Sequence, residues 1–314
     1  MPDFNFDPER DIPDLSGRVI LITGGTGGLG AASAVLLARH NPARIYISGR
    51  RSKAAESVIQ EIREAGNTTT DVRFLFCDLA DLSSVKAAAE EVLTNESDDG
   101  EGRLDMLIAN AGVAAPPPAL SKDGYEVQFA TNHLGHALLI QKLLPLLSRT
   151  AATHGEARIV SVGSFAYRGA SGIPLDRMKA QPRSDWTGIA RWRRYGESKL
   201  ASAVYTRELG RRHPEVLSAS VTPGFVSTAM VAGMTASERL GTKVIAFMAG
   251  GGMVEPEQGA LNQVWAAAVD KERIQNGAMY DPVGVLVDLS KPARDEKLGQ
   301  RLWEWTEAEI KKWL

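Results

Sequence analysis

Cysteine is almost absent from this sequence, which holds only Cys77 among its 314 residues. A single cysteine excludes any disulfide within the chain, and it fits a reducing compartment without requiring one. Long apolar runs are missing as well, since no stretch approaches the roughly 18 residues needed to span a bilayer. The start of the chain, residues 1–20, is acidic and contains several prolines, unlike a signal peptide. These absences predict a cytoplasmic protein with no integral membrane segment.

Neither sign of charge is in excess, because 36 Lys and Arg residues stand against 38 Asp and Glu residues. This balance predicts no general attraction for nucleic acid. The hydrophobic content of 44% is enough for one large α/β core or two modest domains. No internal repeat or linker divides the sequence. We therefore expect one domain over residues 1–314, with a core at about 16–285, an N-terminal tail at 1–15 and a C-terminal helical tail at about 286–314.

Short β-branched segments alternate with longer amphipathic stretches along the chain. Strands are expected at residues 19–22, 44–48, 72–76, 104–109, 158–162 and 218–221. Helices are expected up to residue 38, at 52–65, at 84–93, at about 124–147 and from about 195, with an acidic surface loop at 95–102. Alternation of this kind predicts an α/β fold: a single Rossmann-type, doubly wound parallel sheet with helices on both faces.

Five glycines occupy the seven positions 24–30, directly after the first predicted strand and before an alanine-rich helix. Two phosphate-binding patterns fit at once, G-x-G-x-x-G from residue 25 and T-G-x-x-x-G-x-G from residue 23. Both place backbone N–H groups and a helix N-terminus against a pyrophosphate. The strand–loop–helix context makes an ordinary tight turn a weak alternative.

The end of the second predicted strand distinguishes between cofactors. An NAD site has a carboxylate there that accepts a hydrogen bond from the ribose 2′-hydroxyl. This sequence instead has Gly49 at that position, followed by Arg50 and Arg51. A guanidinium makes charge-assisted bonds to a phosphate, which favours the 2′-phosphate of NADP(H). Either arginine could instead be a solvated residue at a helix start.

Tyr195 and Lys199 stand four residues apart and therefore share one helix face. A phenol, with a pKa near 10, is a poor acid–base catalyst at neutral pH. A nearby ammonium and the positive nicotinamide of an oxidised cofactor would lower the pKa of the phenol. Alone, this Y-x-x-x-K spacing is common and describes a surface pair. It becomes specific because a glycine loop, an N-A-G turn and a strand that ends near a serine precede it.

This combination resembles the short-chain dehydrogenase/reductase family, which uses the T-G-x-x-x-G-x-G loop. The resemblance covers roughly residues 16–285. Its motifs are Thr23, Gly24, Gly28 and Gly30, the turn 109–112, Asn132, Ser164, Tyr195, Lys199 and the segment 223–228. Finer detail is similar to the retinol-dehydrogenase-like branch and its fungal secondary-metabolism relatives.

The resemblance implies a role for each matched residue. Tyr195 would protonate the carbonyl oxygen, Lys199 would hold the nicotinamide ribose, and Ser164 would bind the substrate oxygen. Asn132 would bend the long helix and anchor a water that relays protons to Lys199. The cofactor contacts expected are Gly24, Thr26, Gly28, Leu29, Gly30, Arg50, Asp78, Leu79, Asn110, Tyr195, Lys199, Pro223, Val226 and Thr228.

Several of these residues have plainer alternatives. Ser164 could cap a loop, and Asn110 could satisfy only the backbone of its own turn. Asp78 could bind the adenine amino group or cap the following helix, although Asp81 or Ser83 suits the cap better. His133 and His136 lie three residues apart but lack a third ligand at metal spacing, so a structural role is expected and no metal site. These alternatives lose weight because the motifs occur together.

Two segments are candidates for contacting substrate. The long connection 165–194 must lie beside the active site if Ser164 and Tyr195 meet; its Trp186 and the basic run 191–194 suit an acidic or aromatic substrate, or a solvated loop. The methionine-containing stretch 229–254 suits a lid over a hydrophobic substrate, with contact to a membrane surface as its rival. In the C-terminal tail, Leu298, Leu302 and Trp305 form a helical stripe that would pack on the core or on a partner subunit, so a homo-oligomer stays open.

Together these features predict an NADP(H)-dependent oxidoreductase that interconverts a carbonyl and an alcohol on a hydrophobic biosynthetic intermediate, in the direction of reduction. Polyketide-like or terpenoid-like ketones come first and retinal-type aldehydes second. Two other classes of protein would use the same nucleotide site. One is a cyclase or isomerase that holds the cofactor without net redox change, and the other is a non-catalytic NADP(H) sensor. Both are disfavoured because Tyr195 and Lys199 are present.

Overall fold

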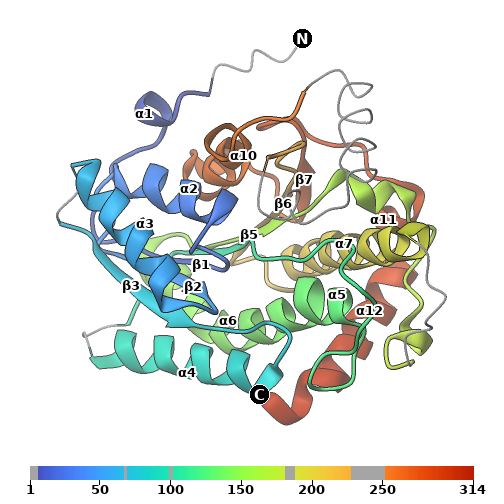
Figure 1. Cartoon of the computed structure of the whole chain (residues 1–314). Helices are drawn as coiled ribbons and strands as arrows, with labels where there is room; N and C mark the ends of the chain where they lie inside the picture. The colour runs from blue at the N-terminus through green and yellow to red at the C-terminus, as the bar shows by residue number, and fades with distance from the viewer. Residues whose placement is uncertain (1–5, 67–68, 99–101, 181–187, 228–251) are drawn as a thin grey trace.

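The computed structural model of the chain describes residues 6–66, 69–98, 102–180, 188–227 and 252–314. At its centre lies a seven-stranded sheet, ordered β3-β2-β1-β4-β5-β6-β7, in which all paired strands run parallel (Figure 1). The strands are β1 Val19–Ile22, β2 Arg44–Gly49, β3 Asp71–Phe76, β4 Met106–Ala109, β5 Arg158–Val162, β6 Leu217–Val221 and β7 Ala278–Tyr280. The predicted Rossmann-type parallel sheet is confirmed.

Helices cover both faces of this sheet. The α-helices are α1 Pro8–Asp11, α2 Gly28–Ala38, α3 Ser52–Glu64, α4 Leu82–Asp98, α5 Val127–Phe129, α6 Gly135–His154, α7 Gly188–Arg212, α10 Pro256–Ala268, α11 Lys291–Arg294 and α12 Glu296–Ile310. Shorter turns are the π-helical η1 Ala130–Leu134 and the 3-10 helices η2 Phe165–Gly169, η3 Leu175–Arg177, η4 Lys271–Arg273 and η5 Lys311–Trp313. None of the described helices combines the length and apolarity needed to cross a bilayer.

The two faces of the sheet carry separate hydrophobic cores. Successive residues of β1 point alternately into them, Val19 and Leu21 into one and Ile20 and Ile22 into the other. Helices α2, α3 and α10 cover the second face, and α4, α6, α7 and α12 cover the first (Figure 1). A strand buried on both sides is apolar at every position, which explains the continuous hydrophobic run in β1.

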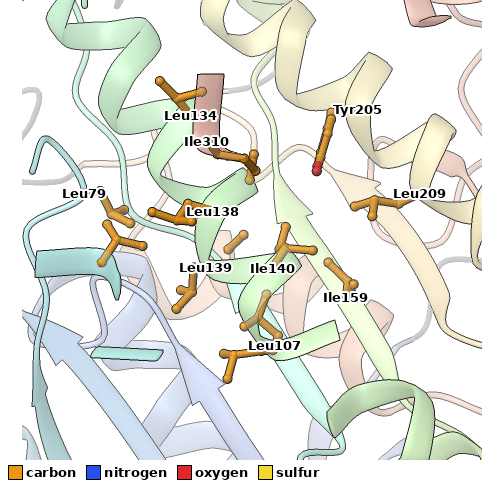
Figure 2. Packing of buried hydrophobic residues seen from close by; sticks show 14 of the residues in the cluster. Leu79, Leu107, Leu134, Leu138, Leu139, Ile140, Ile159, Tyr205, Leu209 and Ile310 are labelled. Carbon is orange, nitrogen blue, oxygen red and sulfur yellow. The ribbon is translucent and has the colours of Figure 1, made fainter. Parts of the chain in front are cut away.

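Figure 2 shows the first of these cores at close range, where side chains of α6 meet those of the central strands. Leu138 and Ile140 of α6 belong to the same cluster as Leu107 of β4 and Ile159 of β5. Tyr205 of α7 and Ile310 of α12 continue the cluster toward the C-terminus. Helix α7, which carries Tyr195 and Lys199, is therefore held between the sheet and α12.

The six predicted strands are present, and the largest shift of a boundary is at β4, which begins at residue 106 instead of 104. Strand β7 and helix α10 were not predicted. The acidic loop expected at residues 95–102 is a partial error, because α4 continues to Asp98. Within that extension Glu96 is buried, where it accepts hydrogen bonds from Arg44 and Tyr46, both at 2.7 Å.

Candidate active site

The turn between β1 and α2 has a shape that glycine alone adopts easily. Gly24 and Gly28 have φ angles of +65° and +53°, in the left-handed region that side chains disfavour. A Cβ atom on Gly30 would collide with the carbonyl oxygen of Gly24, so the loop folds back tightly on the first turn of α2. Gly27 is the N-cap of α2 and has no side chain to cap the helix. The N–H groups of this helix end therefore remain available to an anion. This cradle fits the pyrophosphate of a dinucleotide.

Thr23 joins the glycine loop to the turn after β4. Its hydroxyl accepts hydrogen bonds from the backbone N–H groups of Asn110 at 2.9 Å and Ala111 at 3.0 Å. The Asn110 amide donates in return to the Thr23 carbonyl at 2.8 Å, and its oxygen accepts from Gln263 at 3.3 Å. The Asn110 side chain thus joins the turn after β4 to the glycine loop and to α10, and within the described residues it does not bond the backbone of its own turn. These bonds fix the gap between β1 and β4, the point at which the strand order reverses and such sheets bind ligands.

Gly49 ends β2 beside the glycine loop, with Arg50 and Arg51 exposed directly after it. A Cβ atom at Gly49 would lie 2.6 Å from the Thr26 hydroxyl oxygen. Thr26 therefore lies against the position that would carry the carboxylate of an NAD site, and a side chain at residue 49 would require Thr26 to shift. The two arginines are the cations next to this end of the strand.

Asp78 and Leu79 follow β3 and interact with nearby residues of the chain. The Asp78 carboxylate accepts a hydrogen bond from the N–H of Ala80 at 3.0 Å. Leu79 is 5% exposed and belongs to the core. Asp81 caps α4 as expected, since it accepts from the N–H of Ser83 at 3.0 Å. Any contact of Asp78 with a nucleotide stays a prediction.

Leu29 and Val226 meet although they are far apart in the sequence. A Cβ atom on Gly259 of α10 would collide with Val226 and lie 2.8 Å from Cδ2 of Leu29. The absence of a side chain at Gly259 therefore lets the glycine loop and the loop after β6 close on the same helix. Leu29 and Val226, both predicted to contact the cofactor, therefore lie against the same residue of α10.

The loop after β6 contains Pro223 and Val226. Val226 forms an isolated bridge with Val254, whose carbonyl accepts from the N–H of Ser227 at 2.9 Å. Thr228 and most of the predicted lid at 229–254 lie outside the described residues. Within that lid the structure describes only residues 252–254.

Ser164, Tyr195 and Lys199 converge at the carboxyl end of β5. The Ser164 hydroxyl lies close enough to the Tyr195 phenol to oppose the rise of its pKa by hydrogen bonding. Lys199 lies one helical turn after Tyr195, with its Nζ 5.9 Å from the centre of the tyrosine ring. That Nζ donates to the carbonyl oxygen of Val162 at 2.8 Å. The structure thus brings together the three residues on which the predicted chemistry depends.

Ser164 also performs the capping role that was its alternative. Its hydroxyl accepts from the N–H of Ala166 at 3.3 Å and caps η2. Helix η2 lies directly on α7, because a Cβ atom on Gly196 would come within 2.7 Å of the Ala166 carbonyl oxygen. Close packing at Gly196 therefore holds the serine turn beside Tyr195.

Burial dominates the electrostatics of this cluster. Tyr195 is 8% exposed, and burial raises the pKa of its phenol, although the hydrogen bond from Ser164 opposes that rise. Burial also lowers the pKa of Lys199 to about 8. The expected lowering of the tyrosine pKa by Lys199 and an oxidised nicotinamide stays a prediction, because the structure holds no cofactor and burial dominates the protein alone. The phenol is protonated at neutral pH, as a proton donor must be.

Asn132 lies in the π-helical turn η1, which interrupts the long helix predicted over residues 124–147. Its side-chain oxygen accepts from the N–H of Val113 at 2.8 Å, and its amide donates to Ser198 at 2.9 Å. Its carbonyl oxygen accepts from Ser202 at 3.0 Å. Asn132 thus links the turn after β4 to α7, and π-helical turns are frequent at functional sites. The π-helical turn interrupts the helix where the bend was predicted, and such turns are a known cause of kinks.

The two neighbouring histidines bind hydroxyl groups in different parts of the protein. Nε2 of His133 is 2.9 Å from the Thr306 hydroxyl, and Nε2 of His136 is 2.8 Å from the Thr23 hydroxyl. Burial lowers the pKa of both rings, to about 3 and about 4, so both are neutral. Each ring is thus held by a hydroxyl group of this chain. Among the described residues, no three His, Cys, Asp or Glu side chains gather as a metal site would require.

The sequence analysis missed how the start of α7 is held. Arg194 is 6% exposed and forms an ion pair with Glu197 at 3.0 Å, and Arg191 donates to the Ala115 carbonyl at 3.0 Å. Trp192 packs edge-on against Tyr195, with ring centres 5.6 Å apart. The three-residue spacing of Trp192 and Tyr195 was the available signal. Trp186 lies outside the described residues.

A parallel sheet of this order, with a glycine cradle where the strand order reverses, defines a nucleotide-binding protein of the Rossmann type. A family model described as short chain dehydrogenase matches residues 18–173. A short-chain dehydrogenase/reductase of Armillaria gallica is 34% identical over 306 residues, which cover 96% of this chain and 93% of that protein. The short-chain dehydrogenase/reductase drtF of Aspergillus calidoustus is 34% identical over 315 residues, 96% of each chain.

Among solved structures, a crystal structure of a Mycobacterium paratuberculosis protein matches with a TM-score of 0.70 and 28% identity, over 98% of this chain and 97% of that one. The chain belongs to the short-chain dehydrogenase/reductase family, whose members are oxidoreductases that use a nicotinamide cofactor. The resemblance drawn from the motifs, including that to fungal members, is confirmed.

Proposed function

We propose that this protein is an NADP(H)-dependent reductase that interconverts a ketone or aldehyde and an alcohol, with Tyr195 as the proton donor. The observation that carries this proposal is the convergence of Ser164, Tyr195 and Lys199 beside the loop that Asn132 anchors. Ser164 supplies a hydrogen-bond donor, Tyr195 a proton and Lys199 a positive charge. Reduction of a carbonyl requires these three groups at one point.

The residues around the glycine cradle fit a dinucleotide. Gly24, Gly28 and Gly30 would bring the backbone to the pyrophosphate, with Thr26 and Leu29 beside them. Arg50 would bind the 2′-phosphate, because Gly49, against which Thr26 lies, stands where an NAD site has an acidic residue. The remaining predicted contacts are Asp78, Leu79 and Asn110 toward the adenosine, Tyr195 and Lys199 toward the nicotinamide ribose, and Pro223, Val226 and Thr228 toward the carboxamide.

The glycine cradle and Lys199 would hold NADPH, whose chemistry there would be donation of a hydride to the carbonyl carbon of the substrate. The Tyr195 phenol gives its proton to the carbonyl oxygen, and the Ser164 hydroxyl donates a hydrogen bond to that oxygen as negative charge develops on it. Lys199, positively charged below its pKa of about 8, stabilises the phenolate that remains. Asn132 would orient a water that returns the proton. The same residues run the reaction in either direction, and reduction is the direction proposed.

The proposed substrate is a hydrophobic biosynthetic intermediate. We also infer one domain over the whole chain and a cytoplasmic location. The inference of one domain is supported by Leu15 and Leu302, which are 2% and 0% exposed within the two cores. The residues on both sides of the predicted core thus contribute to it.

A cyclase or isomerase that holds the cofactor, or a nucleotide sensor, would use the same cradle. Neither needs a tyrosine hydroxyl close to a serine hydroxyl beside a buried lysine. The reductase is therefore the reading that this arrangement favours.

Replacing Tyr195 by Phe tests the function directly. The change removes only the hydroxyl and keeps the ring that packs on Trp192. With NADPH and a panel of ketones and aldehydes, we expect kcat to fall by about 10³-fold, in the range typical of lost general acid catalysis. The dissociation constant for NADPH, measured by fluorescence titration, is expected to change little.

Tyr205→Phe is the matched control, because it removes a hydroxyl from the same helix in the core, where the hydroxyl accepts from Gln141 at 2.9 Å. This variant should keep its kcat. Tight NADPH binding without turnover of any carbonyl by the natural sequence would contradict the reductase and favour the sensor. Isomerisation of a substrate with no net NADPH oxidation would favour the cyclase or isomerase.

The preference for NADP(H) predicts a selective effect of Arg50→Ala. Loss of a charge-assisted bond to a phosphate costs about 1.5–3 kcal/mol, so we expect the dissociation constant for NADPH to rise about 10- to 100-fold. The constant for NADH should not change, because NADH has no 2′-phosphate. Arg63→Ala, at the exposed far end of α3, is the control. Equal loss for both cofactors, or tighter binding of NADH by the natural sequence, would contradict the assignment.

A further inference from the structure

Two aromatic side chains flank the proposed catalytic pair on the solvent side. Trp192 is one helical turn before Tyr195 on α7 and is only partly buried. Phe165 follows Ser164 directly and is 51% exposed. Exposed phenylalanine and tryptophan rings lose the hydrophobic free energy that burial would give them. Each ring therefore offers apolar surface next to a residue proposed to act on the substrate.

The contacts of these residues fix the position of the two rings. Trp192 stands nearly perpendicular to the Tyr195 ring, at 86° with centres 5.6 Å apart. Phe165 is the first residue of η2, which Gly196 seats on α7 immediately beside Tyr195. Trp192 thus contacts the phenol from α7, and Phe165 stands directly after Ser164 on η2. The two aromatic residues belong to the two elements that carry the proposed catalytic groups.

Exposed apolar side chains are uncommon in the part of the chain that the structure describes. The large ones are Phe76, Phe165, Ile189, Leu286 and Leu314. Ile189 is 84% exposed and lies three residues before Trp192, so it extends the apolar stripe of α7 away from Tyr195. Exposed apolar surface beside a catalytic cluster indicates a binding site for an apolar group.

The charges near these rings argue against an acidic substrate. Arg194 is buried and paired with Glu197 at 3.0 Å. Arg191 donates to the Ala115 carbonyl, and the Arg168 guanidinium lies over the Phe165 ring, 5.6 Å from its centre. Each of these arginines already interacts with acceptors or rings of this chain. Within the basic run 191–194, which suggested either an acidic or an aromatic substrate, Arg193 alone is exposed, and it pairs loosely with Glu197 at 3.6 Å. The run therefore presents little positive charge to a substrate, which favours the aromatic alternative.

We propose that Trp192 and Phe165 form an aromatic wall at the proposed active site, and that this wall selects carbonyl compounds with a planar aromatic ring beside the carbonyl group. The inference rests on the proposed reductase function and goes beyond it by naming the substrate class. Aromatic rings pack on one another with about 0.5–1.5 kcal/mol more than their buried area accounts for. A flat ring therefore gains more from this wall than a puckered ring of the same size.

The test uses two substrates, phenyl methyl ketone and cyclohexyl methyl ketone, which differ in the planarity of the ring and in its conjugation with the carbonyl group. Because conjugation itself changes the reactivity of the carbonyl, the decisive readout is how the preference changes between variants. With NADPH, the natural sequence should favour the phenyl ketone by about 5- to 10-fold in kcat/KM, the factor that about 1–1.4 kcal/mol produces. Trp192→Ala and Phe165→Ala should each reduce that preference toward unity, and Trp192→Phe should retain most of it. Arg193→Ala changes an exposed neighbour whose ion pair with Glu197 is loose, at 3.6 Å, and should leave the preference unchanged.

A binding measurement separates failure of the wall from failure of the reductase. In the Tyr195→Phe variant with NADPH, calorimetry should show tighter binding of the phenyl ketone than of the cyclohexyl ketone, and the difference should vanish in Trp192→Ala/Tyr195→Phe. This preference without turnover by the natural sequence would support the wall and overturn the reductase. Equal binding of the two ketones, or a preference that survives Trp192→Ala, would overturn the wall.

Discussion

Lys199 is proposed to act as a cation, but it is buried where a positive charge is unfavourable. Burial lowers its pKa to about 8, against about 10.4 in an unfolded chain. The unfolded state therefore binds more protons between about pH 8 and 10.4, so this group makes the folded state more stable as the pH rises through that window. Below pH 8 its contribution is constant and unfavourable. A charged amine held here at neutral pH lowers the stability of the protein.

Replacing Lys199 by Met should therefore stabilise the protein alone while abolishing turnover. Removal of the buried charge gains at most about 3 kcal/mol, and loss of the bond to the Val162 carbonyl offsets about 1 kcal/mol. We expect the free energy of unfolding at pH 7, measured with urea, to rise by about 1–2 kcal/mol. The rise in stability between pH 8 and 10 should shrink at the same time. Lys53→Met on the exposed face of α3 is the control, and a destabilised Lys199→Met protein would refute the argument.

At this same scale, the sequence predicted residue identities well and residue environments poorly. Spacing and order identified Ser164, Tyr195 and Lys199, because a motif records which residues are present. The rise of the Tyr195 pKa in the protein alone was not predicted, because desolvation depends on every group packed around the phenol. The reason for Gly49 was also hidden, since Thr26 meets it only when the loop after β1 folds against the end of β2.

Among the elements, the pairing of η2 with α7 sets the geometry of the site. Gly196 is where the two elements touch, since a Cβ atom there would lie 2.7 Å from the Ala166 carbonyl oxygen. Backbone atoms do not yield as the end of a flexible side chain does. A methyl group at residue 196 would therefore push η2, and Ser164 with it, away from Tyr195.

We expect Gly196→Ala to lower kcat by about 10²-fold, the effect of a displacement of roughly 1 Å between reacting groups. Stability should change little, because alanine favours the helix by about 1 kcal/mol over glycine and offsets the strain. Gly169→Ala is the matched control within η2, as a Cβ atom there meets nothing within 4 Å. Steady-state kinetics and thermal unfolding of both variants decide the matter; an unchanged kcat in Gly196→Ala would show that η2 yields.

Strong periodicity made most elements predictable, and weak or hidden patterns account for those missed. Strand β7 has only three residues, too few for a pattern to form. Helix α4 was ended early because residues 95–102 are acidic, although Glu96 is buried with Arg44 and Tyr46. Such a charge partner comes from another strand and leaves no local signal. The long helix was predicted without its π-helical turn, whose position only the Asn132 role implied.

For the molecule as a whole, the C-terminal residues complete the face of the sheet that carries the site. The Trp303 ring of α12 stacks on Tyr205 of α7, with centres 5.0 Å apart. The Thr306 hydroxyl meets His133 of the π-helical turn at 2.9 Å. Trp305 packs edge-on against Phe129, with centres 5.6 Å apart. The predicted stripe of α12 therefore packs on the core. A partner subunit was the other contact expected for it.

Leu302 lies at the centre of this packing and is fully buried. Because leucine-to-alanine changes in a core typically cost 2–5 kcal/mol, we expect Leu302→Ala to lower the free energy of unfolding by about 3 kcal/mol in urea denaturation. The loss should be cooperative, with one transition seen by both circular dichroism and tryptophan fluorescence, if α12 and the sheet unfold together. Leu314→Ala, at a half-exposed position, should change stability by less than about 0.5 kcal/mol. A separate early transition in Leu302→Ala would mean that α12 detaches on its own, and that the helix carrying Tyr195 and Lys199 does not depend on it.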